Sequence, residues 1–221
     1  MDIQEIFSQQ LTSLPFSTKF TMRSSAGAVL YVAASLTPQA KAGPLGLIVK
    51  IDGKQVANPK AFSNEIGSAR PLVADLQPIA TDFEEHTLTL ESANSEGIAG
   101  PWDFGAATIF YLGMVDPFIW RFSGALPQSK TFQSRITGDG VLFVAASAFT
   151  PKTQMAAIEV LLDGQPVAKT HMKPGIANSH FTFPPLFLPI KLTAKAHTIG
   201  LAASAGVATD QNDTFEVAII Y

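Results

Sequence analysis

Short segments in which apolar and polar residues alternate recur along the chain, and they predict β-strands rather than helices. Residues 86–91 (HTLTLE) alternate at every position, as expected of a strand with one buried face. Residues 47–51 and 158–162 are runs of mainly aliphatic residues, and each run leads into Asp-Gly. Asp-Gly is a strong signal of a tight hairpin turn, because it supplies positive φ at little steric cost. Residues 108–111 and 216–221 are predicted to be closing strands.

The N-terminal leader, residues 1–13, is the one segment in which helical spacing competes with this pattern. Ile3, Ile6, Phe7 and Leu11 would share one face of a helix over residues 2–11. A short helix is therefore an open expectation for the leader.

The chain also repeats itself. Residues 14–35 and 126–147 align without a gap, and 11 of the 22 aligned positions are identical. Shorter matches follow in the same order, among them two Asp-Gly pairs and two His-Thr pairs. We therefore predict a tandem duplication, with a first unit at residues 1–112 and a second at residues 113–221.

The connection between the repeats, residues 113–125 (GMVDPFIWRFSGA), is too apolar for a flexible linker. Two interpretations remain open for its apolar side chains. They pack the two units against each other, or they form the first strand of the second unit.

Several short strands in each unit, separated by Gly and Pro, indicate an all-β fold of two tandem homologous antiparallel β-sandwich units, jelly-roll-like in topology. Each half runs through a Val-Leu-aromatic-Val strand, a strand ending in Asp-Gly, a His-Thr strand and a closing hydrophobic strand. This order resembles jelly-roll modules of the C1q/TNF kind and the β-sandwich modules that bind carbohydrate. The resemblance implies a fold and transfers no functional residue.

The amino-acid composition excludes several classes of protein and of functional site. Charged residues make up 15% of the chain and hydrophobic residues 47%, so the chain is not intrinsically disordered. It has no cysteine, which excludes disulfides, thiolate metal sites and a cysteine nucleophile. A net charge of −3 provides no basic surface, so we expect no nucleic-acid partner. We see no signal peptide, and no apolar run approaches the ~20 residues of a membrane-spanning helix. We therefore expect no membrane insertion, and the compartment stays open.

Sequence motifs of common enzymes are missing. The chain contains no P-loop, no Gly-x-Gly-x-x-Gly after a strand, no Gly-x-Ser-x-Gly elbow and no His-Glu-x-x-His. Its 16 Phe outnumber 3 Tyr and 2 Trp, which favours cores and subunit contacts over a sugar-stacking platform. No catalytic residue and no cofactor is predicted.

Histidine is sparse and partly repeated. His86 and His197 occupy equivalent positions and could be ligands or bases, although a hydrogen bond to a neighbouring loop backbone is the simpler interpretation. His180 belongs to the second unit alone.

A polar turn precedes the last strand. Asp210, Asn212 and Asp213 could supply oxygen ligands to Ca²⁺, but such residues also form turns without an ion. At the same place the first unit has Trp102 and Asp103, and Trp102 is a candidate contact for a ligand or partner, or a buried loop anchor. The candidate contact residues are Trp102, Asp103, His180, Asp210, Asn212 and Asp213.

The favoured prediction is a non-catalytic structural or interaction protein that self-associates, with a homotrimer as the first arrangement to consider. A glycan or a protein is the expected partner class otherwise. The first alternative is a carbohydrate-binding module that uses Trp102 and the loops before the closing strands. The least favoured alternative is a hydrolase-like enzyme built around His180 or Asp213.

Overall fold

A computed structural model describes the chain except for residues 1, 26, 40, 81, 95–102 and 114–116. The chain divides into two compact units, Met1–Val115 and Asp116–Tyr221. Within the described residues, every assigned secondary-structure element is a β-strand. No helix in that part of the chain is long and apolar enough to cross a membrane.

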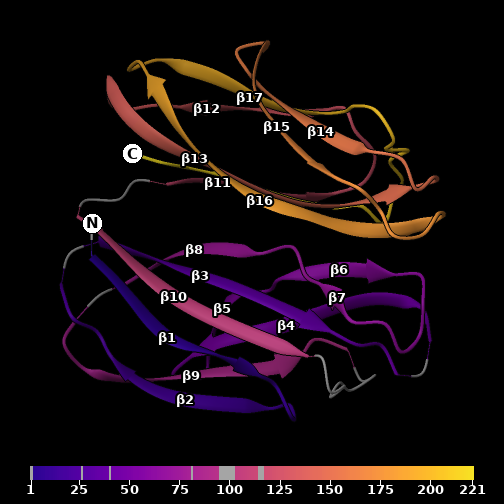
Figure 1. Cartoon of the computed structure of the whole chain (residues 1–221). Coiled ribbons are helices and arrows are strands. Elements are labelled where there is room, and N and C mark those ends of the chain that lie inside the picture. Colours follow the sequence, from indigo (N-terminus) through magenta and orange to yellow (C-terminus); the bar gives the residue numbers. More distant parts are fainter. Residues whose placement is uncertain (1, 26, 40, 81, 95–102, 114–116) are drawn as a thin grey trace. The chain divides into compact units, whose positions relative to one another are not determined.

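The first unit is a sandwich of two antiparallel sheets (Figure 1). One sheet has the order β1-β10-β3-β7, and β8 also pairs with β3. The other has the order β2-β9-β4-β5, and β6 also pairs with β4. The strands are β1 (Asp2–Gln10), β2 (Phe16–Thr21), β3 (Gly27–Leu36), β4 (Gly43–Ile51), β5 (Lys54–Ala57), β6 (Lys60–Ser63), β7 (Arg70–Pro71), β8 (Asp75–Ile79), β9 (Glu85–Ser92) and β10 (Phe104–Gly113).

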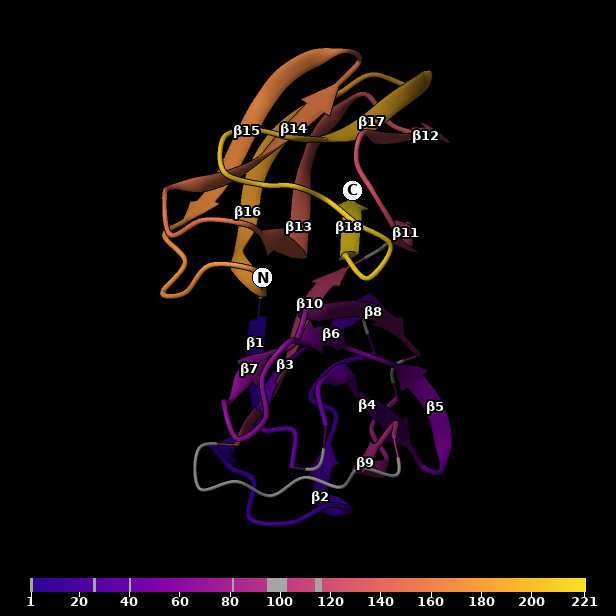
Figure 2. The same ribbon diagram turned by 90° about the vertical axis from the view of Figure 1, so that its right-hand side faces the viewer.

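The second unit repeats this arrangement with eight strands, and Figure 2 shows its two layers. The sheets have the orders β11-β18-β13-β16 and β12-β17-β14-β15. The strands are β11 (Phe118–Ser123), β12 (Gln128–Gln133), β13 (Gly138–Thr150), β14 (Ala156–Leu162), β15 (Gln165–Met172), β16 (Ser179–Leu192), β17 (Ala196–Ala203) and β18 (Thr214–Ile220).

The second unit has the strand order of an eight-stranded jelly roll, and the first unit has the same order with the additional short pairings of β6 and β8. In each, the first strand pairs with the last, and the second strand pairs with the last but one. The predicted fold class, two tandem antiparallel β-sandwich units, is confirmed.

Each sandwich has its own hydrophobic core, formed by the inward-facing residues of both sheets. In the first unit Leu30 and Ile109 of one sheet meet Leu47 and Leu88 of the other, and all four are fully buried. The corresponding core of the second unit includes Val144, Val217, Ile158 and Leu201. The alternation seen in the sequence is thus the signature of these half-buried strands.

The leader does not form the short helix left open by its apolar spacing; most of it is strand β1. A register shift between Glu5 and Phe7 marks a β-bulge, which adds one residue to the strand and interrupts the period of two. In addition, the polar Gln4 is buried, where it accepts a hydrogen bond from the Tyr111 hydroxyl, while Ile3 is exposed. These departures from alternation produced the apparent helical spacing.

The apolar connection contributes β11, the first strand of the second unit. Trp120 is buried in that unit's core, and Phe118 and Phe122 pack against it. The strand interpretation of this segment is confirmed for residues 118–123.

The predicted Asp-Gly turns are present. Asp52 and Gly53 have φ values of 49° and 79°, and Asp163 and Gly164 have φ values of 52° and 76°. Positive φ at both central positions is the geometry of a type I′ hairpin turn. These turns join β4 to β5 and β14 to β15.

Candidate functional site

In the first unit, the Asp-Gly turn is fastened to the start of strand β9. Oδ2 of Asp52 lies 2.6 Å from Nδ1 of His86, and Oδ1 accepts a hydrogen bond from the Thr87 backbone N–H at 2.8 Å. The Asp52 backbone N–H donates in turn to the Thr87 carbonyl oxygen at 2.9 Å. The ring of Phe20 lies 5.6 Å from the ring of His86, centroid to centroid. We call the Asp, His and Thr of this arrangement the Asp–His clamp.

The second unit has the same clamp. Oδ2 of Asp163 lies 2.8 Å from Nδ1 of His197, and Oδ1 accepts from the Thr198 backbone N–H at 2.9 Å. The Asp163 backbone N–H donates to the Thr198 carbonyl oxygen at 2.8 Å, and Phe132 again packs on the imidazole with centroids 5.6 Å apart. Because both units share it, the clamp is part of the duplicated fold, and its Asp and His hold a turn in place.

The two clamps differ at Nε2 of the histidine. Nε2 of His86 lies 2.8 Å from Oδ1 of Asp82, whereas Nε2 of His197 lies 3.0 Å from the Thr193 carbonyl oxygen. The prediction that these histidines bond a neighbouring loop backbone is therefore confirmed for His197. His86 instead lies between two carboxylates, one at each ring nitrogen.

This environment favours a charged imidazole in the first unit. The hydrogen bond to Asp52 is the largest cause that raises the pKa of His86; burial opposes it, and Asp82 adds to it. The same hydrogen bond lowers the pKa of Asp52. The backbone N–H of Glu84, followed by His86, lowers the pKa of Asp82. An imidazolium that donates from both nitrogens has no lone pair for a metal ion or for accepting a proton from a substrate.

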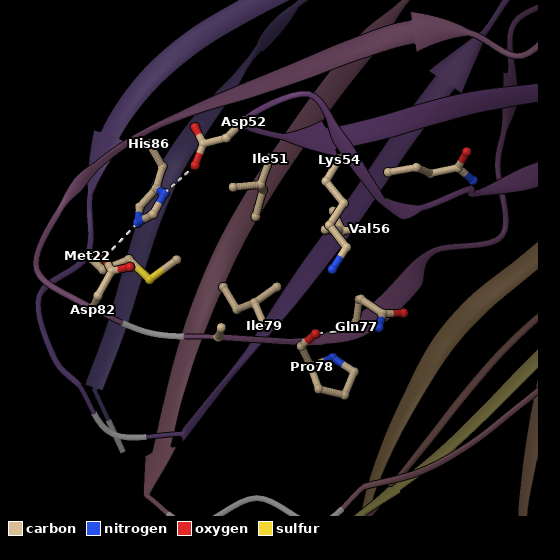
Figure 3. A pocket seen from close by; sticks show the side chains of 12 residues that line it. Met22, Ile51, Asp52, Lys54, Val56, Gln77, Pro78, Ile79, Asp82 and His86 are labelled. Atoms are coloured by element: carbon tan, nitrogen blue, oxygen red, sulfur yellow. Dashed lines mark hydrogen bonds and ion pairs between the residues drawn. The ribbon is translucent and has the colours of Figure 1, made fainter.

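The Asp82 side of the clamp borders a pocket of about 520 Å³ (Figure 3). Ile51, Val56 and Ile79 supply aliphatic walls, and Lys54 and Gln77 supply polar groups. Its size and mixed lining suit a small molecule. However, the clamp's ionisable groups are already paired with one another.

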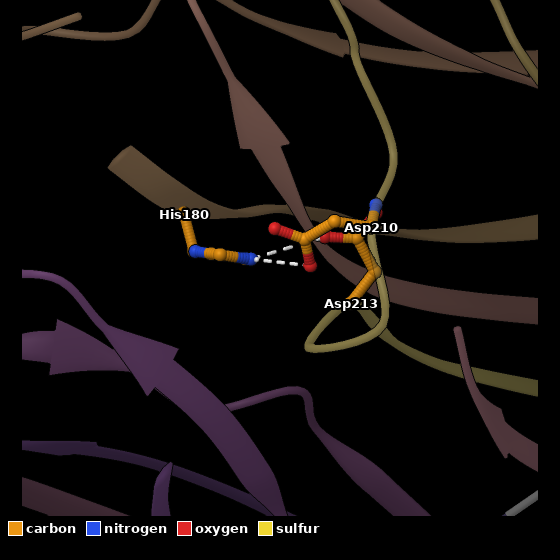
Figure 4. Close-up of side chains that lie close together, drawn as sticks. All are labelled: His180, Asp210 and Asp213. Atoms are coloured by element: carbon orange, nitrogen blue, oxygen red, sulfur yellow. Dashed lines mark hydrogen bonds and ion pairs between the residues drawn. The ribbon is translucent and has the colours of Figure 1, made fainter. Parts of the chain in front are cut away.

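A second cluster lies in the second unit and joins His180 of β16 to the turn before β18 (Figure 4). Nε2 of His180 lies 3.1 Å from Oδ1 of Asp210 and 3.2 Å from Oδ1 of Asp213. The side chains of His180 and Asp213 are 2% and 0% exposed, while that of Asp210 is 37% exposed. All three residues are candidate contact residues from the sequence, and the structure places both carboxylates within about hydrogen-bonding distance of the histidine.

Backbone N–H groups hold the two carboxylates in place. Oδ1 of Asp213 accepts from the Phe149 N–H at 2.9 Å, and its Oδ2 accepts from the Asp210 N–H at 3.0 Å. Oδ1 of Asp210 accepts from the Asn212 N–H at 2.7 Å. The predicted turn is therefore present at residues 210–213, and Asn212 contributes its backbone to it.

Burial affects the pKa values of both His180 and Asp213 in this cluster. Burial raises the pKa of Asp213, although hydrogen bonds from His180 and from the backbone N–H groups of Asp210 and Phe149 oppose the shift. Burial disfavours the charged imidazole of His180, but the hydrogen bonds to Asp213 and Asp210 outweigh it and raise its pKa. The three side chains thus hold a proton on Nε2 of His180, between the carboxylates.

Asp103 is the counterpart of Asp213 in the first unit. It is fully buried, and its carboxylate accepts a hydrogen bond from the Thr37 hydroxyl at 2.7 Å. Its carbonyl oxygen accepts from the Leu11 N–H, as that of Asp213 accepts from the Gly124 N–H. Both aspartates therefore anchor the start of a closing strand. Both carboxylates are fully buried, and a ligand or partner contact through Asp103 or Asp213 stays a prediction.

Among the remaining predicted contact residues, Asn212 is partly exposed, and Trp102 lies outside the described residues. The contact made by Trp102 stays a prediction.

Sequence reasoning missed the partners of His86 and His197. Asp52 and Asp163 were interpreted as turn residues only. A signal was available, because each Asp precedes its His by the same 34 positions in both repeats.

No protein-family model matches the chain, and no curated protein sequence matches it. Among solved structures, it is similar to PNGF-II, with a TM-score of 0.45 and 9% identity over 99% of this chain and 65% of that one. It is also similar to the tandem CBM22 domains of Xyn10C from Paenibacillus barcinonensis (TM-score 0.30, 10% identity, 96% of this chain and 85% of that one). A third is the major capsid protein P2 of bacteriophage PM2 (TM-score 0.30, 9% identity, 99% and 96%). The chain spans less than two thirds of the length of PNGF-II.

Proposed function

We propose that the chain is a non-catalytic structural protein whose β-sandwich units associate with those of other copies of the same chain. The observation that carries this proposal is the pair of exposed apolar side chains, Phe187 of β16 and Val141 of β13, on the outer face of the sheet β11-β18-β13-β16. The outer face comprises the side chains that alternate with the core residues and therefore point away from the core.

Strand register gives the composition of this outer face. Ile119, Ala218, Phe143 and Phe187 follow one another across the four strands in a single row, in which Ala218 and Phe143 are fully buried. The rings of Phe143 and Phe187 lie 4.9 Å apart, and Phe187 is 48% exposed. The adjoining row contains Val141, which is 40% exposed. The outer face of an antiparallel sheet is commonly polar, and here the row with the Arg121–Glu216 ion pair is polar. The exposed apolar side chains in the other two rows favour association.

The first unit has a similar row on the equivalent sheet. Ile3, Phe110, Val29 and Pro78 follow one another across β1, β10, β3 and β8. Ile3 is 48% exposed. Val29 is buried, so each row combines buried and exposed apolar residues, with Ile3 exposed in the first unit and Phe187 in the second. The polar groups around the histidines, in contrast, differ between the units.

The edge of the second unit's sheet favours contact through side chains rather than strand addition. Strand β16 is an edge strand, and it includes Pro184, Pro185 and Pro189. Proline has no backbone N–H to donate to an added strand, and its presence protects edges from open-ended pairing. Closed association, with a trimer as the first arrangement to test, is therefore favoured over fibres.

The test is the mass of the Phe187→Glu variant in solution, measured by sedimentation velocity beside the wild type. A buried carboxylate at the contact would shift the protein towards the single-chain mass of 23.5 kDa. Phe83→Glu is the matched control, because Phe83 is 67% exposed and lies in the first unit, off this face. Circular dichroism checks that both variants fold. A monomeric wild type would refute the proposal, as would a Phe187→Glu variant that associates like the wild type.

A further inference from the structure

The side chains of His180, Asp210 and Asp213 direct three donor atoms towards one point. Nε2 of the histidine and one carboxylate oxygen of each aspartate all lie within 4.8 Å of one another. The two nitrogen–oxygen separations are 3.1 and 3.2 Å. Ligands bound at about 2.0–2.2 Å to a common ion lie roughly 2.8–3.1 Å apart in octahedral geometry and roughly 3.3–3.6 Å apart in tetrahedral geometry. The two nitrogen–oxygen separations therefore lie close to those between ligands of a common ion, and the two carboxylate oxygens lie within 4.8 Å of each other.

His86 also has two carboxylate partners, but they lie at different ring nitrogens. At His86, Asp52 lies against Nδ1 and Asp82 against Nε2, which are opposite sides of the ring. No single ion could contact both carboxylates and a ring nitrogen there. At His180 both carboxylates lie against the same nitrogen, so an ion could occupy the place of the proton that they share.

The surrounding structure holds these ligands in position. The N–H groups of Phe149, Asp210 and Asn212 bond to the two carboxylates, and such contacts orient metal ligands and strengthen binding. Asp210 is 37% exposed, which gives solvent access to one side of the cluster. Water could complete the coordination from that side.

The donor set indicates the class of ion. One imidazole nitrogen with two carboxylate oxygens suits Zn²⁺, Co²⁺ or Mn²⁺. Ca²⁺ prefers six to eight oxygen ligands, so the calcium site considered from the sequence fits these residues less well. From this geometry we infer that His180, Asp210 and Asp213 form a divalent transition-metal site, with Zn²⁺ as its representative ion, that fastens the 210–213 turn to strand β16.

The experiment is calorimetric titration of the full chain, freed of metal with a chelator, with ZnCl₂, MnCl₂ and CaCl₂ separately. We expect one Zn²⁺ per chain, with CaCl₂ binding at least about tenfold more weakly. His180→Gln and Asp210→Asn should each weaken Zn²⁺ binding by at least about 100-fold. His86→Gln is the matched control and should bind Zn²⁺ like the wild type.

A spectroscopic measurement on the wild type tests the inference even if the variants fail to fold. The visible spectrum of the Co²⁺-loaded chain should show the bands of a nitrogen- and oxygen-ligated ion, and Zn²⁺ should displace them in a 1:1 ratio. The absence of Zn²⁺ binding to the wild type would overturn the inference. So would Zn²⁺ binding that survives in folded His180→Gln, or that is lost in folded His86→Gln.

Discussion

The buried Asp213 offers the sharpest test of how the polar cluster contributes to stability. Its carboxylate is fully buried and accepts hydrogen bonds from the N–H groups of Phe149 and Asp210, as well as lying against Nε2 of His180. Asp213→Asn keeps the shape but replaces one acceptor oxygen with an NH₂ group. That group would face an N–H donor that can no longer be satisfied.

The expected loss in the free energy of unfolding follows from these contacts. An unsatisfied buried N–H costs about 1–3 kcal/mol. Removing the sole partner of a buried charge costs about 3–5 kcal/mol. His180 keeps Asp210 as a second carboxylate, so the loss of the Asp213 charge costs less than this. We expect Asp213→Asn to reduce the free energy of unfolding of the second unit by about 2–4 kcal/mol.

Urea denaturation measures this change, with chelator present so that no metal ion contributes. Trp120 is buried in the second core, so a Trp102→Phe background leaves a fluorescence signal from that unit alone. A double-mutant cycle with His180→Gln should give a favourable coupling of about 1–3 kcal/mol. Coupling near zero, or a fully stable Asp213→Asn variant, would refute the reasoning.

Two further predictions concern the clamp and a glycine. Because the pKa of His86 is raised in the folded state, its contribution to stability should be fully present below the unfolded-state pKa of about 6.5 and lost as pH rises through the folded-state value. NMR titration should show a lower pKa for His86 in Asp82→Asn than in the wild type, and an unchanged pKa would contradict the two-carboxylate geometry. Gly206→Ala should reduce the free energy of unfolding by about 2–4 kcal/mol, because a Cβ there would collide with the Met155 carbonyl oxygen at a positive φ. Gly164→Ala has open space around its Cβ and should cost only about 1 kcal/mol, and equal costs in urea denaturation would contradict this explanation.

The fold could be predicted from the sequence because its main signals are local and occur twice. Alternation marks the half-buried strands, and Asp-Gly marks the turns at residues 52–53 and 163–164. Identity between residues 14–35 and 126–147 reveals the duplication without knowledge of any relative. Strand order, in contrast, depends on long-range pairing, such as that of β1 with β10, which composition and periodicity do not specify.

The leader shows where local pattern fails. Glutamine is usually exposed in folded proteins, yet Gln4 is buried, with the Tyr111 hydroxyl donating to its side chain and its own amide donating to the Thr21 carbonyl oxygen. Its partners are distant in the sequence, so no local pattern could reveal them.

The candidate site could be predicted only in part, for the same reason. His180, Asp210 and Asp213 were recognisable as polar residues near turns, but His180 lies 30 positions from Asp210. They meet because β16 and β18 both pair with β13, which brings the start of β16 beside the turn before β18. That proximity is a consequence of jelly-roll topology.

The mass of the wild-type chain in solution, measured by sedimentation equilibrium over a range of micromolar concentrations, tests the central proposal most directly. If the exposed apolar side chains of the outer faces join copies of the chain, the mass will be a defined multiple of 23.5 kDa, with three chains as the first expectation. A mass of 23.5 kDa at every concentration would contradict it.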